Sequence, residues 1–100
     1  MLTINVTEND GRVEVALAGR LDAKAAKEAE AAFIEAAALA KDVVLDLADM
    51  EYVASAGLRA VKRLRGEVKE NGKELTVRGV QEDVMEIFEM TGFAAMLAFE

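Results

Sequence analysis

Apolar and polar positions alternate at the start of the chain in the way that strands require. The alternation runs through residues 2–7 and returns in residues 12–19. A period of two is typical of β-strands with one buried face. Between the two stretches, Asn-Asp-Gly at residues 9–11 is a hairpin turn signal. The pattern therefore predicts an antiparallel pair of strands joined by a tight turn.

The period then lengthens to that of a helix. Residues 21–40 are rich in Ala, Lys and Glu, which favour helices, and Asp22 is a suitable N-cap. Apolar positions recur at helical spacing again in residues 55–72 and 81–92, and each of these stretches ends at a glycine. The sequence therefore predicts three helices.

Three further strands separate and follow these helices. Residues 42–50 form a nearly continuous apolar run, which is typical of a central strand buried on both faces. Residues 74–79 and 95–99 are shorter strand candidates. The resulting order is β-β-α-β-α-β-α-β, which predicts an α/β fold. We expect a single domain over residues 1–100, with a mixed sheet of four to five strands and three or more helices.

Composition excludes several kinds of chemistry. The chain has no His, Cys, Trp or Pro. The usual zinc and copper ligand sets and any Ser-His or Cys-His nucleophile pair are therefore excluded. Neither an EF-hand nor a phosphate-binding loop is present by spacing. We expect no metal, no cofactor and no enzymatic activity, and retain as an alternative an enzyme or small-ligand protein that uses acidic residues.

Charge limits the partners of the chain. The formal net charge is −7, which makes nucleic acid and anionic membrane surfaces poor direct partners. The most apolar stretch, AAFIEAAALA, is too short and too polar to span a bilayer. The first residues lack the pattern of a signal peptide. A soluble cytoplasmic protein is the expectation.

Candidate functional residues lie where strands turn into helices. In open α/β sheets the functional crevice lies outside the carboxyl ends of the strands. We therefore expect one rim to carry Asp22, Asp49, Ser55 and Gly57. Ser55 has two interpretations. It can be the N-cap of the helix that follows, or an exposed phosphoacceptor at a helix N-terminus, where the dipole favours negative charge.

The helix after Ser55 is also basic. It carries five of the twelve Lys and Arg residues of the chain, namely Arg59, Lys62, Arg63, Arg65 and Lys69. These side chains form either an ordinary solvated face or a positive patch suited to an acidic partner. The sequence leaves both interpretations open.

The segment VVLDLADMEYVASAGLRAVKRL combines an apolar strand, an Asp, a short loop and then serine–small–Gly–Leu opening a helix. This pattern resembles that of the STAS domain, the sulfate transporter and anti-sigma factor antagonist domain. LAGRLDA resembles its L-x-G-x-L-D segment. NGKELTVRGV and EIFEMTGFAAMLAFE resemble its last strand–helix–strand run. The resemblance covers essentially the whole chain.

The resemblance implies roles for particular residues. Ser55 corresponds to the regulatory phosphoserine, and Gly57 and Leu58 correspond to the Gly-Leu that follows it. Ala54 stands where the family often has Asp or Ser. The partner-binding surface implied in this way comprises Asp22, Ala54, Ser55, Ala56, Gly57, Leu58, Arg59 and Lys62.

The same resemblance implies a function in bacterial transcription regulation. An anti-sigma factor antagonist, or anti-anti-sigma factor, binds a serine-kinase anti-sigma factor and so releases a sigma factor. Phosphorylation by that kinase ends the interaction, and a PP2C-type phosphatase restores it, a cycle known as partner switching. The alternative is a STAS subunit of a larger signalling or lipid-transport assembly, without a phosphoswitch.

Overall fold

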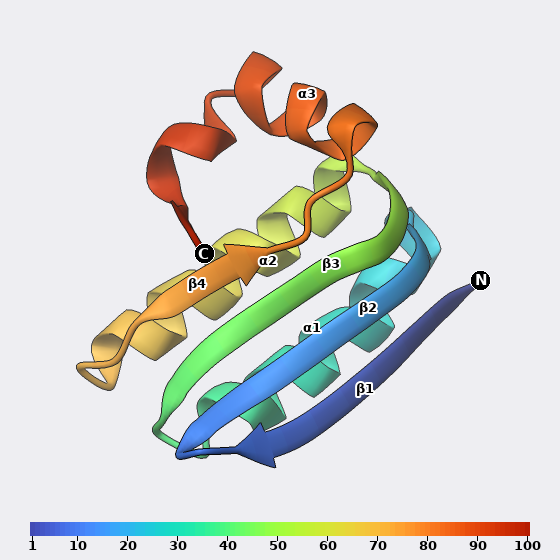
Figure 1. The fold of residues 1–100 in the computed structure, drawn as a ribbon. Coiled ribbons are helices and arrows are strands. Elements are labelled where there is room, and N and C mark those ends of the chain that lie inside the picture. Colours follow the sequence, from blue (N-terminus) through green and yellow to red (C-terminus); the bar gives the residue numbers. More distant parts are fainter.

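The chain folds, in a computed structural model that describes residues 1–100, into the strands and helices drawn in Figure 1. In chain order they are β1 (Leu2–Asn9), β2 (Arg12–Leu21), α1 (Ala23–Ala37), β3 (Asp42–Val53), α2 (Ser55–Glu70), β4 (Leu75–Arg78), α3 (Glu82–Met90), the 3-10 helix η1 (Phe93–Met96) and β5 (Ala98–Phe99). This order confirms the predicted α/β fold class and the mixed sheet.

The sheet has five strands in the order β1-β2-β3-β4-β5. β1 and β2 are antiparallel, and every other neighbouring pair is parallel. A two-residue turn joins β1 to β2, and both of its residues have positive φ, 53° at Asp10 and 79° at Gly11. Asp-Gly suits this type of turn because both residues tolerate the left-handed region. The predicted hairpin is therefore confirmed.

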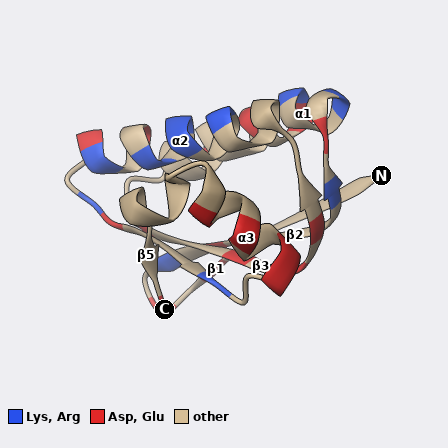
Figure 2. Cartoon of the chain, turned by 90° about the horizontal axis from the view of Figure 1, so that it is seen from above, with Lys and Arg blue, Asp and Glu red and all other residues tan.

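Helices α1 and α2 cover the same face of the sheet (Figure 2). The β2 side chains that point toward them, Val13, Val15 and Leu17, are at most 1% exposed. On α1, the facing stripe consists of Ala26, Ala29, Phe33, Ala36 and Ala37, all buried. Small alanine side chains let α1 lie close to the sheet, which explains why so alanine-rich a segment forms an ordered helix.

β3 is the central strand, as predicted, but it extends three residues beyond the expected end. Val43, Val44 and Leu45 are buried, and pairing with β2 continues as far as Leu21 opposite Val53. Two register shifts, each with one extra residue in β3, allow the pairing to continue. Such bulges depend on the partner strand, so the sequence of residues 42–53 alone does not reveal them.

The C-terminal segment departs from the predicted strand over residues 95–99. Gly92, with φ 77°, ends α3, and the chain continues into η1 before the two-residue strand β5. The rings of Phe88 and Phe93 lie 5.7 Å apart and help to anchor this turn. Aromatic packing after a left-handed glycine therefore shortens the strand.

None of the helices is long and apolar enough to cross a membrane.

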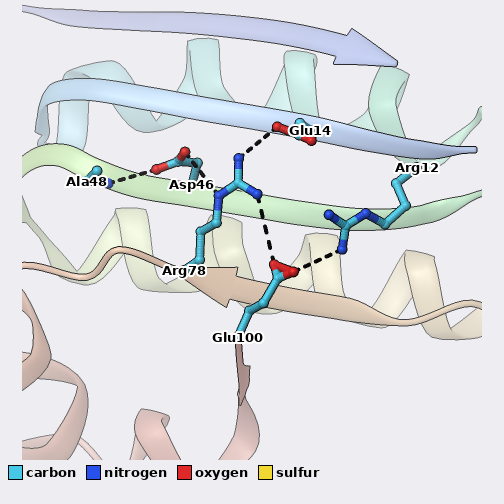
Figure 3. Close-up of polar contacts among 6 residues, drawn as sticks. All are labelled: Arg12, Glu14, Asp46, Ala48, Arg78 and Glu100. Carbon is cyan, nitrogen blue, oxygen red and sulfur yellow. Dashed lines mark hydrogen bonds and ion pairs between the residues drawn. The ribbon is translucent and has the colours of Figure 1, made fainter. Parts of the chain in front are cut away.

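The face of the sheet opposite α1 and α2 carries an ion-pair network (Figure 3). Arg78 donates hydrogen bonds to Glu14 at 2.7 Å and to Asp46 at 3.2 Å. Glu100 lies 3.9 Å from Arg78 and accepts a hydrogen bond from Arg12 at 3.1 Å. The bonds to Glu14 and Asp46 raise the pKa of the Arg78 guanidinium above its ordinary value. The network ties three strands and the C-terminal residue together.

Candidate functional site

The two predicted strand-to-helix turns lie side by side. α1 follows the carboxyl end of β2 and α2 follows that of β3, and both helices begin at the same end of the sheet (Figure 1). The Ala54 N–H donates a hydrogen bond of 2.9 Å to the Leu21 carbonyl. This bond joins the residue before Asp22 to the residue before Ser55, so the two candidate side chains stand on adjacent turns. We call the surface formed by these two turns, which carries Asp22 and Ser55, the rim.

Asp22 is the N-cap of α1, as predicted. Its backbone is extended, with φ −86° and ψ −177°, and its Oδ1 accepts a hydrogen bond from the Ala25 N–H at 2.8 Å. The side chain is half-buried. Asp22 therefore has a structural role in starting α1 and also contributes a negative charge to the rim.

Ser55 is not the N-cap of α2, so that interpretation is wrong. Ala54 occupies the cap position, with extended φ −93° and ψ 170°, and no side chain caps the helix. The Leu58 N–H donates the first helical hydrogen bond, to the Ala54 carbonyl. Ser55 is thus the first helical residue, and it is exposed. The first amide groups of α2 therefore lack a side-chain acceptor.

Gly57 explains how α2 can begin so close to β2. A Cβ atom at this position would lie 2.7 Å from Leu21 Cγ and 2.9 Å from the Leu21 carbonyl oxygen. Only glycine leaves room for this approach. Gly57 itself is buried, so it lies beneath the rim and is not part of its exposed surface.

The remaining candidates surround Ser55. Ala54, Ala56 and Leu58 are partly buried, whereas Arg59 and Lys62 are exposed and take part in no ion pair within the chain. The exposed positive charges of α2 are visible along the helix in Figure 2. The rim therefore combines small residues with free cationic side chains.

Arg63, one turn further along α2, is partly neutralised. It lies 3.6 Å from Glu30 and 3.9 Å from Glu67. Arg59, Lys62, Arg65 and Lys69 form no ion pair, so the free positive charge of α2 is spread along the helix and includes its first two turns.

Asp49 does not join the rim. It pairs with Ala18 of β2, three residues before Leu21, which places it about 10 Å back along the strand. In addition, no three His, Cys, Asp or Glu side chains lie close enough together to hold a metal ion.

One feature near the rim was missed by the sequence-based prediction. The Arg20 guanidinium lies 4.3 Å from the centre of the Tyr52 ring, a cation–π arrangement. These residues are opposite each other only because of the two register shifts between β2 and β3. No local sequence signal indicates the pair.

Comparisons with known proteins agree with the fold. The sequence profile of the STAS domain matches residues 3–100. BtrV of Bordetella bronchiseptica, provisionally assigned as an anti-sigma factor antagonist, is 31% identical over 98 residues, which cover 95% of this chain and 83% of BtrV. A structure of an anti-sigma factor antagonist from Mycobacterium paratuberculosis matches with a TM-score of 0.85 and 24% identity, over 99% of this chain and 85% of that one. The phosphorylated form of the Bacillus protein SpoIIAA matches with a TM-score of 0.74 and 14% identity, over 98% of this chain and 91% of that one.

Proposed function

Because this chain belongs to the STAS domain family, we propose that it is an anti-sigma factor antagonist with Ser55 as its phosphorylated switch. The assignment of BtrV, a relative aligned over nearly the whole chain, supports the antagonist role. The structural likeness to the mycobacterial antagonist supports a shared fold. Ser55 as the switch is supported by the local geometry of α2.

The main support for the proposal is the exposure of Ser55. It is the first residue of α2, a 16-residue helix that has no side-chain cap. An exposed hydroxyl is accessible to a kinase. Once phosphorylated, it would sit beside amide groups that have no helical acceptor, at the positive end of the helix dipole. The domain can therefore accept the modification without unfolding.

The switch then acts at the interface with the partner. A phosphoserine carries about −1.5 to −2 charges at neutral pH. The unmodified rim presents small side chains at Ala54 and Ala56, which allow close approach, and free positive charges at Arg59 and Lys62. A hydrated dianion on Ser55, on the turn adjacent to that of Asp22, would have to be desolvated against the partner. Left unpaired, it would cost several kcal/mol and weaken binding by orders of magnitude.

The proposed partners are a serine-kinase anti-sigma factor and a PP2C-type phosphatase. The kinase binds the unmodified rim and transfers phosphate to Ser55, and the phosphatase removes it. All covalent chemistry belongs to these two enzymes, so the chain acts as substrate and binding module. We place this cycle in the cytoplasm, where the released sigma factor acts on transcription.

Phosphate mapping tests the proposal directly. The purified domain would be incubated with ATP, Mg²⁺ and a recombinant serine-kinase anti-sigma factor from the same genome. We expect a single added phosphate, on Ser55, and none on the Ser55→Ala variant. The other hydroxyl residues are Thr3, Thr7, Tyr52, Thr76 and Thr91. Phosphate on one of these would refute the assignment of Ser55, and binding without any phosphorylation would favour a STAS subunit that lacks a phosphoswitch.

A further inference from the structure

β1 is an unprotected edge of the sheet. It occupies the first place in the strand order and pairs only with β2 (Figure 1). Its eight residues, LTINVTEN, contain neither Lys nor Pro, and its pairing with β2 has no register shift. Natural edge strands are usually shortened, bulged or protected by Lys or Pro, because an open edge invites pairing with another strand. The edge therefore has the features of a pairing surface.

The hydrogen-bonding direction of each β1 residue follows from one observed bond. The Arg20 N–H donates to the Met1 carbonyl at 3.4 Å, which extends the register of Leu2 opposite Gly19. Hydrogen-bonded and non-hydrogen-bonded pairs alternate along an antiparallel ladder. Odd-numbered residues of β1 therefore bond to β2. The amide and carbonyl groups that point to the free edge belong to Leu2, Ile4, Val6 and Glu8.

An apolar hollow lies beside this edge. It is lined by Val6, Ala32, Glu35, Ala36 and Leu39, so it lies between β1 and the C-terminal half of α1. Val6 is 43% exposed and Leu39 42%, which places both among the few large apolar side chains that remain exposed. The hollow opens on the same side of the sheet as the Ile4 and Val6 side chains, since residues of one parity share a face.

We propose that the free edge of β1 pairs with β1 of a second copy of this chain, antiparallel, about a two-fold axis at Asn5. In this register Ile4 lies opposite Val6 of the other copy, and Leu2 lies opposite Glu8. Every outward-pointing amide and carbonyl group of β1 is then paired. The Ile4 side chain of each copy lies beside Val6 and the hollow of the other, and Thr3 faces Thr7 on the opposite side.

Neighbouring registers are less favourable. An axis at Ile4 leaves the outward groups of Glu8 without a partner residue in the other β1. An axis at Val6 places Leu2 opposite Asp10 of the other copy, which lies in the hairpin turn outside β1, so the outward groups of Leu2 have no partner strand residue. The axis at Asn5 is therefore the one that pairs all four outward-pointing residues of β1.

The proposed dimer leaves Ser55 free, whereas Asp22 shares a hollow with Met1 and Leu2 at the start of β1. β1 packs on β2 and α1, whereas Ser55 begins α2. Each copy carries a formal charge of −7, so the two repel one another at low ionic strength. Salt screens this repulsion but not the main-chain hydrogen bonds or apolar contacts. Association should therefore strengthen as salt is raised from low to physiological concentration.

Cysteine cross-linking tests the register, because the chain has no cysteine of its own. At the two-fold axis the Cα atoms of residue 5 form a non-hydrogen-bonded pair about 4.5 Å apart, which a disulfide can bridge. We expect Asn5→Cys to form a covalent dimer under mild oxidation. Thr7→Cys is the matched control. The two copies of residue 7 would be about 13 Å apart, too far for a disulfide.

Sedimentation over a concentration series, at low and high salt, tests the association itself. We expect a monomer–dimer equilibrium that Val6→Lys or Val6→Pro shifts to monomer. The proline removes only an outward-pointing N–H, so the β1–β2 ladder is kept, and circular dichroism would verify folding. Ala95→Lys, which adds the same charge at an exposed site on η1, should dimerise normally. A monomer under all conditions, or equal cross-linking of Asn5→Cys and Thr7→Cys, would overturn the proposal.

Discussion

A single missing side chain sets how closely α2 approaches β2. At Gly57 a Cβ atom would lie 2.9 Å from the Leu21 carbonyl oxygen, which already accepts the Ala54 N–H. We expect Gly57→Ala to lower the free energy of unfolding by about 1–3 kcal/mol, because the helix must shift to avoid the overlap. Urea denaturation would measure the change.

Gly66, in the same helix, is the matched control. Its Cβ position has no neighbouring atom within 4 Å. Gly66→Ala should therefore raise the free energy of unfolding, by up to about 1 kcal/mol, through helix propensity alone. Similar effects of the two substitutions would show that the contact with Leu21 is unimportant.

Ser55 contributes little to folding, and its proposed role is that of the switch. Since it is not a cap, Ser55→Ala should change the free energy of unfolding by less than about 0.5 kcal/mol. Ser55→Asp should also fold, because α2 tolerates a negative charge at its first residue. In titration with the kinase, Ser55→Ala should bind as the unmodified domain does and Ser55→Asp more weakly. Equal binding by both variants would mean that Ser55 is not the switch.

Asp22 and Ser55 differ in how far the sequence determines their roles. Asp22 is the only capping residue near the start of α1, and it caps as predicted. Near the start of α2, Ser55 is the stronger capping residue by type, yet Ala54 holds the position. The reason is tertiary, because the bond from Ala54 to Leu21 fixes where the helix begins. Residue preferences cannot supply that information.

The helix α2 has no side-chain cap at its N-terminus. The backbone of Ala54 is already extended, with φ −93° and ψ 170°, as a capping residue requires. Ala54→Ser should therefore stabilise the domain by about 1 kcal/mol in urea denaturation. Ala56→Ser, inside the first turn, cannot cap and is the control. If the two variants are equally stable, α2 does not begin where the structure places it.

Elements whose own sequence carries a clear hydrophobic pattern were predicted well. Strand ends that depend on contacts with other elements were not. The hairpin of β1 and β2 and the apolar start of β3 follow from local sequence. The last residues of β3 and the brevity of β5 do not. They depend on register shifts against β2 and on packing of Phe93 against Phe88.

At the scale of the whole molecule, the proposed switch residue lies apart from the core and from the ion-pair network. One face of the sheet carries the core and two helices, the other carries the Arg78 network, and the rim lies at one end (Figures 1 and 3). Phosphate at the rim should therefore leave the fold intact. The phosphorylated domain should melt at or slightly above the temperature of the unmodified one, since the helix dipole contributes roughly 0.3–1 kcal/mol. A clear drop in Tm would mean that the modification loosens the domain instead.

The most direct test of the phosphoswitch is calorimetric titration of the serine-kinase anti-sigma factor with the unmodified and the Ser55-phosphorylated domain. We predict measurable binding by the unmodified domain and a loss of affinity of at least about a hundredfold on phosphorylation, which corresponds to roughly 2.7 kcal/mol. Unchanged affinity after quantitative phosphorylation of Ser55 would contradict the account.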